Sequence, residues 1–194
     1  MQRMKTVAWS EGRWSRKPVS IDQEGSNLVA EAAPESDWWR TTSYGFIHDD
    51  GHALLKDFPN ESAVEVSFIL NYTEQFDQAG IFIISDEKNW IKAGVEYCDG
   101  FPQVGAVVTQ VNSDWSVAPV AEWMNKEVTI RVSRSGDAVT IRAGINSDLR
   151  LVRVAPLDPT RTWQAGPMFC APTRAGLKIT FTNWSIGEAD SALH

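Results

Sequence analysis

One stretch decides the fold class: Val128-Thr-Ile-Arg-Val-Ser-Arg-Ser-Gly-Asp-Ala-Val-Thr-Ile-Arg142. Apolar and polar residues alternate on both sides of the segment Arg134-Ser-Gly-Asp137, whose composition is typical of a tight turn. A period of two places every second side chain on the same face of an extended strand. The stretch therefore predicts a β-hairpin with one apolar and one polar face.

The same period of two recurs along most of the chain. Apolar residues alternate with mainly polar ones in residues 64–72 and again in residues 177–182. No window of twelve residues shows a convincing helical stripe, and residues 121–126 allow one helical turn at most. Many short strands without helices predict a β-sandwich or a β-barrel. Further strands are expected at residues 28–32, 37–42, 79–85, 90–97, 103–111, 149–154 and 166–171.

The length of 194 residues suits one sizeable core and is short for two. We therefore expect a single domain over residues 1–194, with its core at about 8–186 and a polar tail at 187–194. The chain has 25 acidic and 18 basic residues, for a formal net charge of −7. This charge argues against nucleic acid and against an anionic membrane surface as partners. The apolar run at 79–84 is far too short to span a bilayer.

The N-terminal residues carry two early positive charges but no apolar segment of the kind found in signal peptides. We therefore expect a cytoplasmic protein. Two cysteines, Cys98 and Cys170, are too few for a disulfide framework, and both lie in apolar surroundings. Buried free thiols are the favoured interpretation, and a disulfide is the alternative.

Two of the expected strands are apolar on both faces, which a simple sandwich strand should not be. In residues 79–84, Ile81 and Ile83 lie on one face while Phe82 and Ile84 lie on the other. The strand at 103–111 is likewise apolar or small on both sides. The second face of each strand should therefore be covered by a loop, by a ligand in a groove, or by a partner subunit.

The segment Trp90-Ile-Lys-Ala-Gly-Val-Glu96 is the best candidate for a binding face. An aromatic ring, a cation, a bare backbone and a carboxylate on one face suit a polyhydroxylated ligand. The alternative is a covered face on which the charged residues pair with neighbouring strands. A direct pair between the two charged residues is not expected, because four residues of strand span about 13 Å. Alternation places Trp90, Lys92, Gly94 and Glu96 together on this face.

Polar residues near the ends of these strands are expected to line the rim of such a site. A loop tryptophan beside polar residues, as in Ser113-Asp-Trp-Ser116, serves either as a wall of the site or as a lid on the core. Of the pair Trp38 and Trp39, alternation predicts one ring in the core and the other outside. The predicted rim residues are Gln75, Asp77, Gln78, His52, Thr109, Asp114 and Trp115.

Metal and catalytic motifs are weak. The segment His48-Asp-Asp-Gly-His52 offers two imidazoles and two carboxylates, but no distant His or Cys cluster completes a metal site, so we expect neither a metal nor a cofactor. The chain has no nucleophile elbow and no phosphate-binding glycine loop. Glycoside hydrolysis needs two carboxyl groups close together. Glu96 and Asp77 could supply them only through a tertiary contact.

Eight short motifs together resemble a family of uncharacterised bacterial and fungal proteins that includes the yeast regulation-of-enolase protein. The resemblance covers residues 8–186 and implies a concanavalin A-like jelly roll, with two antiparallel sheets of which one is concave. In lectins and glucanases of that superfamily, the concave face or its rim binds glycan. The glucanase pattern of alternating carboxylates and the legume-lectin metal signature are both absent here. In order, the motifs are Ser36-Asp-Trp-Trp-Arg-Thr-Thr42, Tyr44-Gly-Phe46, Gly51-His52, Phe76-Asp-Gln-Ala-Gly80, Trp90-Ile-Lys-Ala-Gly-Val-Glu96, Asp99-Gly100, Val108-Thr109 and Ser113-Asp-Trp-Ser116.

Three functions follow as hypotheses. The first is non-catalytic binding of a carbohydrate or a sugar-like metabolite on the concave sheet face, through the residues named above. The second is a glycosidase-like enzyme that uses Glu96 and Asp77. The third is a regulatory domain whose second apolar face contacts a metabolic enzyme, another protein partner or a sister subunit, which predicts a dimer or a larger assembly.

Overall fold

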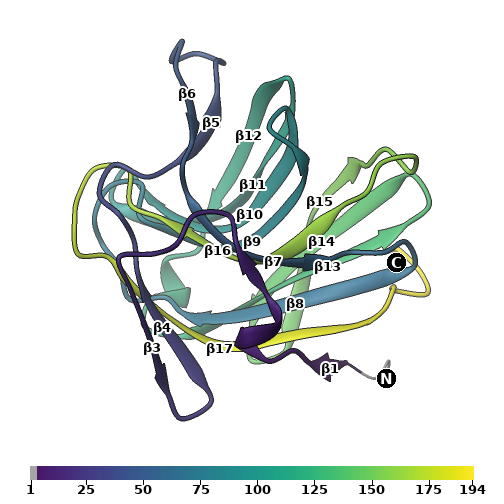
Figure 1. Cartoon of the computed structure of the whole chain (residues 1–194), viewed down its shortest axis with the longest axis horizontal. Coiled ribbons are helices and arrows are strands. Elements are labelled where there is room, and N and C mark those ends of the chain that lie inside the picture. Colours follow the sequence, from purple (N-terminus) through teal and green to yellow (C-terminus); the bar gives the residue numbers. More distant parts are fainter. Residues whose placement is uncertain (1–3) are drawn as a thin grey trace.

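Almost every segment with a period of two forms a strand in the computed structural model, which describes residues 4–194 (Figure 1). The first of two large antiparallel sheets has the order β15-β14-β13-β8-β17-β4-β3, and β1 pairs with β17. The hairpin predicted at residues 128–142 is formed by β13 and β14. The strands of this sheet are β1 (Lys5–Thr6), β3 (Ser20–Glu24), β4 (Asn27–Glu31), β8 (Ser62–Ile69), β13 (Glu127–Ser135), β14 (Ala138–Ile145), β15 (Asp148–Pro156) and β17 (Lys178–Glu188).

The second sheet has the order β12-β11-β10-β9-β16-β7-β2 and is also antiparallel. Among the described residues there is no α-helix, and the two single-turn 3-10 helices are η1 (Trp9–Glu11) and η2 (Ala121–Trp123). The predicted sandwich of two antiparallel sheets is therefore confirmed. The strands of the second sheet are β2 (Arg13–Trp14), β7 (His52–Asp57), β9 (Gln78–Asp86), β10 (Asn89–Cys98), β11 (Phe101–Gln110), β12 (Asn112–Pro119) and β16 (Gln164–Cys170).

The core lies between the two sheets and follows the predicted alternation. Each fully buried Val or Ile side chain contributes about 1.5 to 3 kcal/mol relative to an exposed one. The polar partners of these residues point away from the core, which fixes the register of each strand. Val128, Ile130 and Val132 of the first sheet and Ile81, Ile83 and Ile91 of the second are each no more than 2% exposed.

Three glycines lie side by side across the second sheet. Gly94 of β10 is opposite Gly80 of β9 and Gly105 of β11. A Cβ atom on Gly94 would lie 2.1 Å from the carbonyl oxygen of Ala79, so only glycine fits without moving a strand. Gly94 is thus a point of close approach between neighbouring backbones. The glycine row leaves the sheet face between the charged residues of β10 without side chains.

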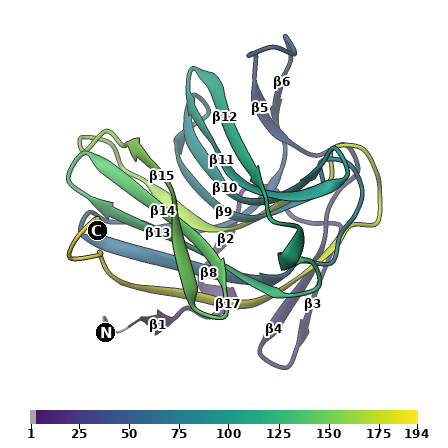
Figure 2. The same ribbon diagram turned by 180° about the vertical axis from the view of Figure 1, so that it is seen from behind.

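A separate hairpin, β5 (Trp38–Arg40) and β6 (Ile47–Asp49), stands over the inside of the bend formed by strands β9 to β12 (Figure 2). Trp38 stacks on Phe82 with ring centroids 4.2 Å apart, within a second apolar cluster on the side of the sheet away from the core. The chain's own hairpin therefore covers the second apolar face of β9. The prediction of one inner and one outer tryptophan is wrong, because Trp38 and Trp39 are only 5% and 8% exposed.

Two further segments are arranged in ways that the sequence pattern did not indicate. The segment Ser113-Asp-Trp-Ser116, expected as a rim loop, lies within β12, because Val111 at φ 69° turns the chain back directly after β11. The expected polar tail is held in place, since β17 continues to Glu188 and Asp190 accepts hydrogen bonds from two arginines of the first sheet. Hydropathy alone does not reveal such an ion-pair anchor, because both partners are polar.

Candidate functional site

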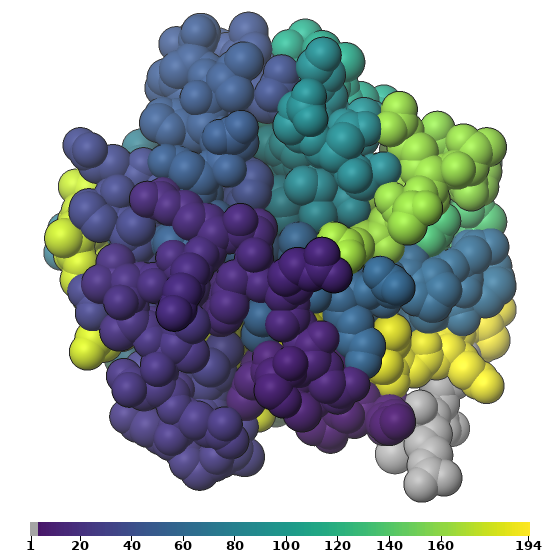
Figure 3. All heavy atoms as spheres, in the orientation of Figure 1, coloured from purple at the N-terminus to yellow at the C-terminus, as the bar shows by residue number. Residues whose placement is uncertain are grey.

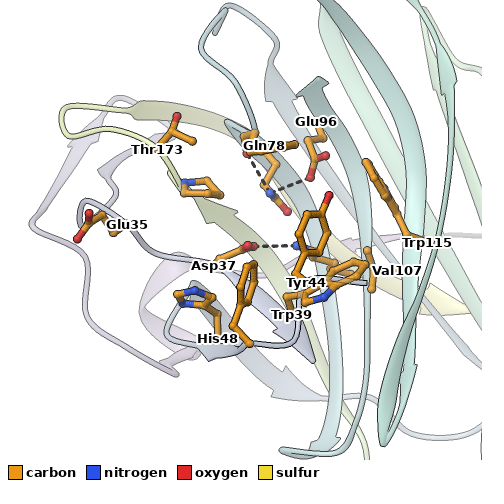
Figure 4. A pocket seen from close by; sticks show the side chains of 14 residues that line it. Glu35, Asp37, Trp39, Tyr44, His48, Gln78, Glu96, Val107, Trp115 and Thr173 are labelled. Atoms are coloured by element: carbon orange, nitrogen blue, oxygen red, sulfur yellow. Dashed lines mark hydrogen bonds and ion pairs between the residues drawn. The ribbon is translucent and has the colours of Figure 1, made fainter. Parts of the chain in front are cut away.

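A cavity of about 500 Å³ lies between the β5–β6 hairpin and the hollow side of strands β9 to β12 (Figure 4). In the space-filling view the hairpin packs directly beside the β10–β12 region (Figure 3). Two hydrogen bonds from Arg40, one to Ser113 Oγ and one to the Val111 carbonyl, join the hairpin to that edge of the sheet. The cavity is lined by Glu35, Asp37, Trp39, Tyr44, Phe46, His48, Phe76, Gln78, Lys92, Glu96, Val107, Trp115, Pro172 and Thr173.

An ion pair between Lys92 and Asp37 forms part of the cavity floor. Lys92 Nζ lies 3.0 Å from Asp37 Oδ1, and the two side chains are only 6% and 18% exposed. Burial disfavours the ammonium form, but the charge and hydrogen bond of Asp37 together with the charge of Glu96 and the thiol of Cys170 outweigh it, so the pKa of Lys92 is raised. Lys92 thus stays charged, and its charge is matched within the protein. Its partner lies in the segment before β5 rather than on a neighbouring strand.

Glu96 is the second charged group on this strand face. Its Oε2 accepts a hydrogen bond of 2.9 Å from Gln78 Nε2, and the amide also donates to the Phe76 carbonyl (Figure 4). Burial raises the pKa of Glu96 to about 7, against an opposing effect of Lys92. Near neutral pH this side chain therefore exchanges between a carboxylic acid and a carboxylate.

Aromatic rings form the opposite wall of the cavity. Trp39 meets Tyr44 at 5.5 Å and 80° and meets Trp115 at 6.3 Å and 85°, both edge to face. Tyr44 stacks on Phe46 at 5.3 Å. Aromatic faces of this kind pack against the apolar C–H faces of a ligand, while the polar floor can form hydrogen bonds to it.

The structure brings four of the predicted site residues into the cavity: Lys92, Glu96, Gln78 and Trp115. Trp90 shares their strand face, but it is 1% exposed and packs against Trp38 and Phe82 within the second apolar cluster. The strand face is therefore divided into a part sealed by the hairpin and a part that lines the cavity.

Asp77 and His52 do not line the cavity. The Asp77 carboxylate is fully buried and bound by Arg174, and burial raises the pKa of Asp77 despite that pairing. His52 is also fully buried, accepts a hydrogen bond from the Ala33 amide and stacks on Phe169. The proposed pairing of Glu96 with Asp77 is therefore not formed: Gln78, the first residue of β9, lines the cavity beside Glu96, whereas Asp77 directly before it is bound by Arg174 outside the cavity.

The other three predicted rim residues are used elsewhere. Thr109 of β11 is buried and hydrogen-bonded to its cross-strand partner Ser113 of β12, next to the turn that joins the two strands. Asp114 pairs with Arg153 of the first sheet at 2.9 Å, and Gln75 donates to Asp99 at 3.1 Å. Only the Asp114 pair joins the two sheets, and none of the three residues lines the cavity.

The aromatic residues that the hairpin contributes to the wall are the part of the cavity that sequence reasoning missed. Tyr44, Phe46 and His48 come from a short hairpin, and Asp37 lies 55 residues before Lys92 in the sequence. A usable signal was present, because a run with four aromatic residues in residues 38–46 is too dense for one face of a core strand.

The structure also shows the surroundings of the two cysteines and of the possible metal-binding groups. Cys98 and Cys170 are buried free thiols, as predicted. Burial raises the pKa of Cys98 to about 11 and raises the pKa of Cys170 well above its usual range. Within residues 4–194, no group of three or more His, Cys, Asp or Glu side chains is arranged to hold a metal ion. Neither of the short helices in this part of the chain is long and apolar enough to cross a membrane.

Comparison with known proteins places the chain in a family. The family model described as "Protein of unknown function (DUF1349)" matches residues 14–189. "Regulation of enolase protein 1" of Saccharomyces cerevisiae is 36% identical over 198 residues, covering 100% of this chain and 98% of that protein.

Two solved structures share the fold. The crystal structure of a functionally unknown protein from Saccharomyces cerevisiae matches with a TM-score of 0.87 and 34% identity, over 96% of this chain and 100% of that one. A xylan β-1,4-xylosidase from Bacillus halodurans matches with a TM-score of 0.71 at 13% identity, over 97% of this chain and 40% of that one. The second likeness shows the fold alone.

Proposed function

We propose that this chain, which belongs to the DUF1349 family of proteins of unknown function, binds a sugar or a sugar-like metabolite without cleaving it. The observation that carries the proposal is the cavity of about 500 Å³, in which aromatic rings face a carboxylate and an amide. A volume of this size falls within the range of about 300 to 1,000 Å³ that is usual for small-molecule sites. A sugar ring has apolar C–H faces and a polar edge, so it needs both kinds of wall.

Binding is favoured over hydrolysis by the positions of the acidic groups. Glycosidases place two carboxyl groups on either side of the scissile bond. Of the two considered from the sequence, only Glu96 lines the cavity, while Asp77 is bound by Arg174 outside it. Of the other two acids that line the cavity, Asp37 is already engaged by Lys92, and Glu35 is exposed on the far side of the cavity from Glu96 (Figure 4).

Thermal unfolding in the presence of glucose, xylose, galactose, glucosamine and N-acetylglucosamine tests the proposal. A ligand at about one hundred times its dissociation constant adds about 2.7 kcal/mol of stability. For a domain of this size, that raises Tm by about 5 to 10 °C. We expect such a rise with at least one of these sugars at millimolar concentration, and the absence of any rise with all five would overturn the proposal.

The matched variants are Trp115→Ala and Trp9→Ala. Both rings are half-buried and both meet another tryptophan ring at 6.3 Å, but Trp9 packs on Trp184, outside the cavity. Loss of the sugar-induced rise in Trp115→Ala alone supports the cavity as the site. A rise that persists in Trp115→Ala, or one that disappears only in Trp9→Ala, contradicts it.

The name of the yeast relative supports a second candidate, an effect on enolase through the tip of the β5–β6 hairpin. Tyr44, Phe46 and Ile47 are 52%, 42% and 53% exposed there, and neighbouring exposed apolar side chains are typical of interaction surfaces. The test is the rate of purified enolase with and without this chain. A change in rate that Ile47→Asp removes and Val154→Asp retains supports this candidate, and an unchanged rate contradicts it.

A further inference from the structure

The basic side chains that line the cavity, one ammonium and one imidazole, each already lie beside an acidic group. Lys92 is 3.0 Å from Asp37, and His48 Nδ1 is 3.8 Å from an Asp50 oxygen. Among residues 4–194, no cationic side chain forms an ion pair with the other two acids of the wall, Glu35 and Glu96. The cavity therefore carries negative charge that the protein itself leaves unmatched.

Glu96 is the deeper of these two acids and retains binding capacity. Gln78 donates to Oε2, whereas no residue in the described part of the chain donates to Oε1. A partly buried carboxylate without a cationic partner is unfavourable, which accounts for its raised pKa of about 7. The charged groups that act on it are Lys92, Asp37 and Asp99, and two of these three are acidic. A positively charged ligand group at Oε1 would supply the cationic partner that the Glu96 carboxylate lacks.

The aromatic wall suits the same positive charge. Trp39 stands nearly perpendicular to both Tyr44 and Trp115, so the rings form adjoining walls rather than one flat stack. The electron-rich face of an aromatic ring attracts an ammonium group within about 6 Å of its centroid. In the close-up, the Glu96 carboxylate and the rings of Tyr44 and Trp115 face one shared space (Figure 4).

We infer that the ligand of this cavity carries a protonated amine, as an amino sugar does, and that the amine pairs with Glu96 beside the rings of Tyr44 and Trp115. This inference rests on the proposed function and narrows it to a class of ligand. A neutral sugar leaves the Glu96 carboxylate without a counter-charge, and an acidic sugar is repelled by it. The Lys92 ammonium only partly offsets this preference, because it pairs with Asp37, whose own negative charge acts on Glu96 in the opposite direction.

Isothermal titration near neutral pH with glucosamine, glucose and N-acetylglucosamine tests the inference. Only glucosamine carries an ammonium group, and the acetylated sugar controls for the nitrogen substituent. A hydrogen bond to a charged group is worth about tenfold to one hundredfold in affinity, so glucosamine should bind that much more tightly than the other two. The readout is the ratio of the glucosamine and glucose dissociation constants.

Glu96→Gln keeps the shape of the side chain and removes its charge, so the ratio should fall to about one. Glu127→Gln is the matched control, because Glu127 is exposed at the start of β13, outside the cavity, and the ratio should not change. Glucose and glucosamine binding equally tightly would overturn the inference and leave the proposed function standing. A preference that survives Glu96→Gln, or that Glu35→Gln removes instead, would also overturn it. Failure of all three sugars to bind would count against the proposed function itself.

Discussion

Replacing Glu96 by glutamine should change how the stability of the protein depends on pH. The carboxyl group has a pKa of about 7 when folded and an ordinary value of 4.5. Between these values the folded protein holds a proton that the unfolded chain releases, so wild-type stability falls as pH rises. At about 1.36 kcal/mol per pH unit, the loss is at most about 3 kcal/mol. Glutamine is neutral at every pH and keeps its hydrogen-bonding partner Gln78, so the variant escapes this loss.

Urea unfolding at about pH 5 and about pH 8 measures the effect as a difference between the two proteins. We expect similar stabilities at the lower pH and a variant more stable by up to about 3 kcal/mol at the higher one. Other titrating groups, such as Asp77 and His52, are present in both proteins and cancel in the difference. Glu127→Gln changes an exposed residue, so the stability of this variant should depend on pH in the same way as that of the wild type. A difference between Glu96→Gln and wild type that stays constant over this range would refute the account of the buried carboxyl.

Three other substitutions test the architecture around the cavity. Lys92→Met leaves the Asp37 carboxylate buried without its partner and should cost about 3 to 5 kcal/mol in urea unfolding, whereas the double variant with Asp37→Asn should recover most of it. Gly94→Ala should cost at least about 2 kcal/mol in the same assay, because its Cβ would lie 2.1 Å from a neighbouring carbonyl oxygen, and a neutral result would contradict the close approach. Trp38→Ala removes the ring that stacks on Phe82 and should cost about 3 to 5 kcal/mol. It should also abolish sugar binding, and retained affinity would show that the hairpin is not a wall of the site.

The fold could be predicted wherever strand residues alternate between core and solvent. Residues 64–69 of the strand predicted at 64–72 lie in β8, residues 70–72 follow the end of that strand, and residues 128–142 form the β13–β14 hairpin. Strand β7 was missed because the hairpin covers its second face: Ala53 and Leu55 lie in the outer apolar cluster, while Leu54 lies in the core. Such a strand has no period of two in its hydropathy.

Only the part of the site that lies on one face of a single strand could be predicted from the sequence. Alternation is enough to place Lys92 and Glu96 together on one side of β10. It cannot place Asp37, which lies 55 residues before Lys92 in the sequence and contacts it only because of the way the chain leads into the hairpin. Nor can it place Tyr44, because the position of the hairpin over the sheet depends on packing at Trp38 and on the bonds of Arg40. Polar residues near strand ends, such as Asp114, can form ion pairs between the sheets as readily as they can line the rim of a site, and alternation does not distinguish the two roles.

The most direct test of the central claim is a titration of the protein with glucosamine, followed by the NMR signals of the tryptophan indole N–H groups. Trp39 and Trp115 line the cavity, while Trp9 and Trp184 stack on each other outside it. Substitution of each ring by phenylalanine assigns its signal. The account predicts that the signals of Trp39 and Trp115 shift together with one dissociation constant, while those of Trp9 and Trp184 stay in place. Signals that all remain fixed, or a shift confined to Trp9 and Trp184, would contradict it.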